Sequence, residues 1–92
     1  MPRRLLQLPL IPDRWQWLEF QKVEPPNTKR FYRIEIAPTA SGWAVITYRG
    51  RIGQQPRPLI ETFASPEQAV ERALKRAHDR LLHGYLITGY GV

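Results

Sequence analysis

The chain has 92 residues, with 14 Lys and Arg against 8 Asp and Glu, a formal net charge of +6, and no cysteine. This length accommodates one domain with a small core and leaves little for a second. The lack of cysteine excludes a disulfide framework and every zinc site built on thiolates. The basic excess favours an anionic partner, with nucleic acid ahead of an anionic membrane surface, although charge alone does not select between them.

Residues 1–12 are predicted to form a tail, so that a single domain spans residues 13–92. The tail resembles a signal peptide, but its apolar stretch is short, carries a glutamine, is broken by prolines and precedes no small-residue cleavage site. The prolines favour an extended backbone. Its leucines either fold back onto the domain as an apolar clip or belong to a loose terminus. No run approaches the ~20 apolar residues of a membrane span, so we expect a cytoplasmic protein with no membrane partner.

Four segments have strand character: 15–23, 30–36, 43–48 and 59–63. The second of them alternates, with Tyr32, Ile34 and Ile36 on one face, which is the period of a half-buried strand. Short turns join the segments, so they are expected to pair as an antiparallel meander. Residues 86–92 also have strand character and are a candidate edge strand.

One helix is predicted between the last of these strands and the C-terminal segment. Ser65 is a capping residue, Pro66 suits the first helical position, and Gln68 completes a capping box. The pattern continues to about Leu82, and Gly84 supplies the stop.

The faces of this helix differ in composition. Its apolar stripe consists of Ala69, Ala73, Ala77 and Leu81, with Val70 and Leu74 beside it. Arg72, Lys75 and Arg76 are predicted to point toward water, whereas Arg80 falls at the margin of the buried face and should reach along the sheet. We therefore predict an α+β fold, with about four antiparallel strands and one main helix packed across one face.

The most informative stretch of the chain is the glycine- and arginine-rich connection at 48–53. It contains Arg49, Gly50 and Arg51, and Arg57 follows shortly after. Glycine lets backbone N–H groups approach an anion closely, and arginine offers a planar fork that matches phosphate oxygens. Two interpretations remain open at this point, a loop that holds a nucleic-acid backbone and a glycine turn with solvated arginines.

No catalytic or metal-binding constellation is apparent. His78 and His83 are five residues apart and would not share a helix face. Ser41 and Ser65 are the serines, and both suit turn or cap roles. The carboxylates are scattered, and no nucleotide-binding or hydrolase motif occurs. We therefore expect a protein that is not an enzyme, with no catalytic residue, metal, cofactor or small-molecule substrate.

The order of these features resembles the WGR domain, known from DNA-dependent poly(ADP-ribose) polymerases and from small stand-alone bacterial proteins. The matching pieces are Asn-Thr-Lys-Arg-Phe-Tyr at 27–32, Gly-Arg-Ile-Gly at 50–53, Phe-Ala-Ser-Pro-Glu-Gln-Ala at 63–69 and Arg-Leu-Leu-His-Gly-Tyr at 80–85. The resemblance covers a core of residues 15–85. One departure matters, because Arg49 stands where the family has its tryptophan.

What the resemblance implies is a DNA-contacting domain. In the polymerases the tryptophan packs against the sugar at a DNA terminus, and the arginine of the motif helps to organise the assembly. Arg51 and Arg80 carry over by position, whereas the stacking residue does not. Arg49 can stack through its planar face and also pair with phosphate, so it either retunes the contact with DNA or marks a relative that no longer binds DNA ends.

The leading hypothesis is a non-catalytic nucleic-acid-binding module that contacts phosphate and sugar. Its predicted contact residues are Asn27, Lys29, Arg30, Arg49, Gly50, Arg51, Arg57 and Arg80. The alternative is a protein-interaction module that uses an aromatic sheet face, with Trp15 and Trp17 on the same side of a strand. Trp43 is expected to fill the core. A third hypothesis, an accessory domain of a longer enzyme, is mildly disfavoured by Met1 and the absence of a linker.

Overall fold

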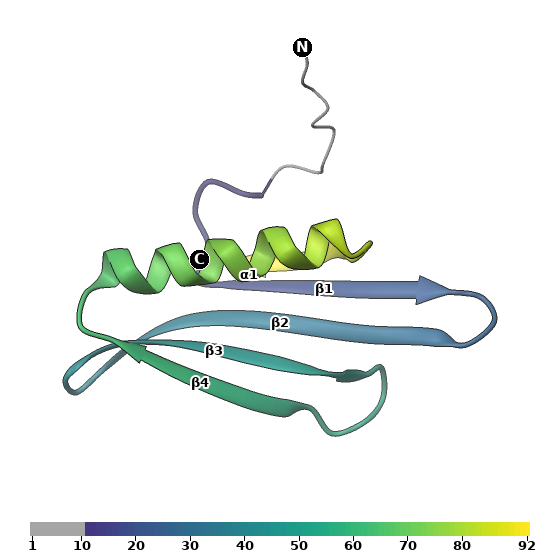
Figure 1. Cartoon of the computed structure of the whole chain (residues 1–92), viewed down its shortest axis with the longest axis horizontal. Helices are drawn as coiled ribbons and strands as arrows, with labels where there is room; N and C mark the ends of the chain where they lie inside the picture. Colours follow the sequence, from purple (N-terminus) through teal and green to yellow (C-terminus); the bar gives the residue numbers. More distant parts are fainter. Residues whose placement is uncertain (1–10) are drawn as a thin grey trace, which may run out of the picture.

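The computed structural model describes residues 11–92, and these form a five-stranded antiparallel sheet with one helix across one face (Figure 1). The elements are β1 (Trp17–Glu24), β2 (Thr28–Thr39), β3 (Gly42–Arg51), β4 (Arg57–Phe63), α1 (Pro66–Leu82) and β5 (Leu86–Gly91). The strand order is β4-β3-β2-β1-β5. The predicted α+β class is confirmed, but the sheet has five strands rather than about four because β5 pairs with β1.

The start of the domain lies beside the core. Ile11 packs against the core cluster, and Trp15 does the same just before β1 begins. The two interpretations of the tail, an apolar clip or a loose terminus, concern residues 1–10, which lie outside the described residues. Within residues 11–92, α1 lacks the length and the apolar character that crossing a bilayer requires.

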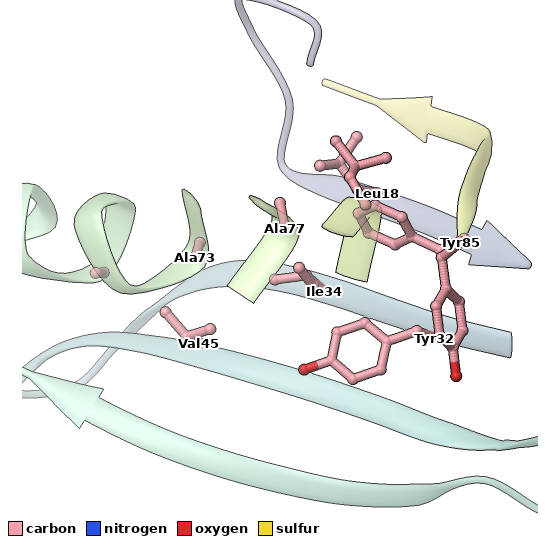
Figure 2. Close-up of a cluster of buried hydrophobic side chains, with 10 residues drawn as sticks. Leu18, Tyr32, Ile34, Val45, Ala73, Ala77 and Tyr85 are labelled. Carbon is pink, nitrogen blue, oxygen red and sulfur yellow. The ribbon is translucent and has the colours of Figure 1, made fainter. Parts of the chain in front are cut away.

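The core lies between α1 and the inner face of the sheet (Figure 2). Strand alternation directs Leu18, Ile34 and Val45 toward the helix, and all three are fully buried. The helix presents Ala73 and Ala77 to them, and these small side chains let α1 lie close to the strands. Burying each large side chain contributes roughly 1.5–3 kcal/mol. The alternation predicted for the second strand is thus the alternation that builds the core.

Both predicted ends of the helix are correct. The Oγ of Ser65 accepts a hydrogen bond from the Gln68 N–H at 3.3 Å, and Pro66 occupies the first helical position. At the other end Gly84 adopts a φ of +89°, which glycine tolerates without steric cost. The Tyr85 N–H then donates to the carbonyl of Arg80 at 3.1 Å, as expected for a helix that ends in a Schellman turn.

The prediction that Trp15 and Trp17 share one exposed face is wrong. Regular β1 geometry begins only at Trp17, so strand alternation does not extend back to Trp15, which packs on the core instead. The Trp17 indole lies against β5, where a Cβ added at Gly91 would come within 2.5 Å of its Cε2. The Arg33 guanidinium covers the same indole, with its Cζ 4.4 Å from the ring centroid. Trp43 packs against the core, as predicted.

Two helix arginines that were expected to point toward water reach the sheet instead. Arg72 pairs with Glu61 of β4 at 2.6 Å, and Arg76 pairs with the other carboxylate oxygen of Glu61 at 2.8 Å. Lys75 is exposed, as predicted. The helix therefore has a polar flank bound to β4.

Candidate nucleic-acid interface

The strand register places two pairs of arginines on the side of the sheet that carries α1. Arg49 lies directly opposite Arg57 in the β3–β4 pair, and Arg51 lies opposite Arg30 in the β2–β3 pair. Arg49 is also the partner of Tyr32, a core residue beneath the helix. Because directly opposed residues share a face and side chains alternate along a strand, all four arginines project to this side. They are exposed, whereas Tyr32 is buried.

These four arginines and Arg80 of α1 line one open hollow of about 410 Å³, called here the arginine hollow. Its complete lining is Arg30, Phe31, Arg49, Gly50, Arg51, Gln54, Gln55, Arg57, Arg80 and Tyr85. Phe31 and Gly50 belong to the opposite face by strand alternation, although both line the hollow. Residues from three strands, a loop and the helix thus meet in one concave surface.

Hydrogen bonds hold the β3–β4 connection against the start of β2 and the β1–β2 turn. The Ile52 N–H donates to the Lys29 carbonyl at 2.9 Å, and Gly53 turns the chain with a φ of +89°. The Nη2 of Arg51 donates to the carbonyl oxygen of Asn27 at 3.4 Å. The loop that carries the Gly-Arg sequence is therefore tied to a second turn, and this limits the positions that its arginines can take.

Arg80 is held by two aromatic rings and one carboxylate. Its Cζ lies 4.8 Å from the Tyr32 centroid and 5.4 Å from the Tyr85 centroid, a cation–π geometry. Its Nη2 donates to Asp79 at 2.7 Å, and its buried Nε has no partner within residues 11–92. Burial alone would lower the pKa of Arg80, but the hydrogen bond to Asp79 and the Coulombic attraction of Tyr32, Asp79 and Tyr85 together outweigh burial and raise it. The same bond lowers the pKa of Asp79.

The arginines of the hollow differ from other arginines of the domain in their acidic neighbours. Arg33, for example, pairs with both Glu19 and Glu35, at 2.6 and 2.7 Å. Among residues 11–92, no carboxylate lines the arginine hollow, and Asp79 is the acidic residue that pairs with one of its arginines. Positive charge is therefore concentrated in the hollow and left available to an external anion.

The structure gathers most of the predicted contact residues and leaves two aside. Those that it brings into the hollow are Arg30, Arg49, Gly50, Arg51, Arg57 and Arg80. Lys29 points to the opposite face by alternation, and Asn27 lies in the β1–β2 turn, where its carbonyl binds Arg51. Sequence reasoning missed Phe31, Gln54, Gln55 and Tyr85. The glutamines could have been chosen from their place in the Gly-Arg loop, whereas Tyr85 depends on the turn at the end of α1.

Comparison with known proteins identifies the family of this chain. No curated protein and no solved structure gives a significant match to the chain. The WGR domain family model matches residues 15–89. This range includes the whole of α1 and the whole sheet apart from the end of β5. The resemblance noted in the sequence is thereby confirmed over most of the chain, and the protein belongs to the WGR domain family.

Proposed function

We propose that this protein is a non-catalytic nucleic-acid-binding module that holds the phosphate and sugar of a strand in the arginine hollow. WGR domains are in general domains of the nucleic-acid-binding type. The more detailed proposal is that the β3–β4 loop and the C-terminal end of α1 make the contacts. It rests on the geometry of the hollow and on its charge.

The observation that carries the proposal is the convergence of five arginines that have, among residues 11–92, a single acidic partner between them. Like charges placed directly opposite on a sheet destabilise it, and here two such pairs lie side by side. Hydration and salt reduce that repulsion in the free protein. A phosphate bound between the guanidinium groups would replace repulsion with charge-assisted hydrogen bonds.

The chemistry of the lining suits backbone contacts more than the reading of base sequence. Arginine forks match phosphate oxygens in pairs, and contacts to phosphate and sugar position a protein without specifying sequence. Arg49 occupies the place of the family tryptophan, and its planar face can still stack on a sugar or base. A preference for free DNA ends therefore depends on whether the Arg49 guanidinium stacks on a terminal sugar or base or pairs with a phosphate.

Fluorescence anisotropy with labelled oligonucleotides tests this function. The probes are blunt duplex DNA, the same duplex closed by hairpins, single-stranded DNA and single-stranded RNA, each titrated at several salt concentrations. Each phosphate contacted on duplex DNA should add ~0.9 to the slope of log K against log salt. Substituting both Arg49 and Arg51 with alanine should weaken binding and lower this slope by about 1.8, which is two such contacts.

The matched control is Lys75→Ala, because Lys75 is an exposed cation of α1 outside the arginine hollow. This variant should bind like the unmodified protein. If the double arginine variant also binds with unchanged affinity and slope, the hollow is not the site. If the unmodified protein binds none of the probes even at low salt, the nucleic-acid function itself is wrong.

A further inference from the structure

The flank of α1 opposite its polar flank carries an apolar groove. One hollow of about 410 Å³ is lined by Pro66, Glu67, Val70, Glu71 and Leu74. A second hollow, of about 290 Å³, adjoins it, because Val70 and Leu74 line both. Trp15, Pro12 and the C-terminal Val92 contribute to the second hollow. We call these two hollows together the α1 groove.

The rim of this groove has the opposite charge to the arginine hollow. Glu67 and Glu71 border the first part, and Asp13 borders the second, where Arg14 is the basic neighbour. Local charge is therefore acidic on a protein whose net charge is +6. The floor remains open to solvent within residues 11–92, with Val70 43% exposed. A segment that fits the groove would carry apolar side chains for the floor and basic side chains for the rim.

The chain itself supplies such a segment at the place where it meets the groove. Pro12 lines the groove, and residues 1–10 precede it outside the described residues. In sequence this segment carries leucines at 5, 6, 8 and 10 and arginines at 3 and 4. The leucines come nearest to Pro12 along the chain, and the arginines come farther from it. The groove has the same order: its apolar floor at Val70 and Leu74 adjoins Pro12, and its acidic rim at Glu67 lies farther from Pro12.

Length and backbone chemistry are compatible with this fit. An extended chain spans up to ~3.3 Å per residue, so ten residues reach about 33 Å. The distance along α1 from Leu74 back to Pro66 is about 12 Å at 1.5 Å per residue. Pro2 and Pro9 each fix their own φ and disfavour helical backbone at the preceding residue. Ordering a segment with this sequence in a groove therefore costs less conformational entropy than ordering one without proline.

We propose that the α1 groove is the binding site for residues 1–10 of this same chain. The leucines pack on Val70 and Leu74, and Arg3 and Arg4 lie near Glu67 and Glu71. This arrangement covers the apolar flank of α1. It leaves the arginine hollow free, because the polar flank that binds β4 separates the two surfaces.

Paramagnetic relaxation in the full-length protein tests the proposal. The chain has no cysteine, so Gln7→Cys provides a unique site for a nitroxide label. The label should abolish the backbone amide signals of Val70 and Leu74 and leave those of Leu59 and Ile60 on β4 intact. Val70→Asp should restore the Leu74 signal, whereas Thr62→Asp, an exposed control on β4, should not. Intact Val70 and Leu74 signals in the labelled protein would overturn the proposal.

Two further arms separate the possible occupants. In a mixture of chains that carry only the nitroxide and chains that carry only the isotope, no signal should be lost. Attenuation of Val70 and Leu74 in this mixture would show that a second copy fills the groove and would overturn the proposal. Reversing Arg3 and Arg4 to glutamate should weaken the attenuation, and adding Glu67→Arg with Glu71→Arg should restore it. Failure of this restoration would contradict the proposed pairing, and none of these outcomes depends on nucleic-acid binding.

Discussion

Reversing one charge in the arginine hollow should stabilise the free protein while it weakens nucleic-acid binding. Arg57 lies directly opposite Arg49 on the α1 side of the sheet, and both are exposed. Opposed side chains have Cβ atoms ~5 Å apart, and a charge pair there is worth roughly 0.2–1 kcal/mol, unfavourable for like charges. Arg57→Glu exchanges repulsion for attraction, so the free energy of unfolding should rise by about 0.4–2 kcal/mol.

Thermal denaturation at low and high salt measures this effect. For a domain of this size ~1 kcal/mol shifts Tm by about 4–8 °C, so a rise of several degrees is expected at low ionic strength. The gain should shrink near 1 M salt, where the Debye length falls to ~3 Å. Arg14→Glu is the control, because it makes the same change in net charge at an exposed position outside the hollow. In oligonucleotide titrations Arg57→Glu should bind more weakly than Arg14→Glu.

Two results would refute the reasoning. An Arg57→Glu protein with the Tm of the unmodified protein at low salt would mean that Arg49 and Arg57 do not repel each other measurably. An equal rise in Arg14→Glu would mean that lower net charge, and not the opposed pair, causes the stabilisation. Either result would remove the physical basis for treating the hollow as an unsatisfied anion site.

Two other predictions follow from individual contacts. Gly91→Ala should lower the free energy of unfolding by about 1–3 kcal/mol in urea denaturation, because the added Cβ overpacks against the Trp17 indole. Gly89→Ala is the control, since its Cβ would meet the same ring at an ordinary 3.5 Å, and it should change the free energy of unfolding by less than ~1 kcal/mol. Asp79→Asn should tighten oligonucleotide binding up to about fivefold by freeing Arg80 from an exposed pair worth ~1 kcal/mol or less. Because the pKa of Asp79 is lowered, its stabilising contribution is full above its unfolded-state pKa and is lost as pH falls through its folded-state pKa. When the free energy of unfolding is measured against pH, this part of the loss at acidic pH should be absent from Asp79→Asn.

Local features of the sequence were sufficient to predict the helix and the alternation of the second strand. Ser65 and Gly84 mark the ends of α1, because a capping hydroxyl and a residue that adopts positive φ act within a few residues of their own position. The alternation of Tyr32 and Ile34 likewise predicted the inner face of β2, since the period of a strand is a property of the backbone. The arginines and glycines of the β3–β4 loop also marked the candidate site.

Relations between distant segments depended on the tertiary structure. Strand alternation predicted one face for Trp15 and Trp17, but the pairing of β1 with β2 and β5 begins only at Trp17, and Trp15 lies before that point. The exposed position predicted for Arg76 failed for a similar reason, because Glu61 comes within reach only when α1 packs on β4.

The candidate site shows the same division. Arg49 and Arg51 are neighbours in sequence, but Arg30 and Arg80 join them only through strand register and the crossing of α1. Register and crossing are determined by which apolar faces bury one another across the whole sheet. The sequence alone therefore identified the kinds of residue suited to a phosphate and most of their positions, whereas the folded chain decided which of them surround one hollow.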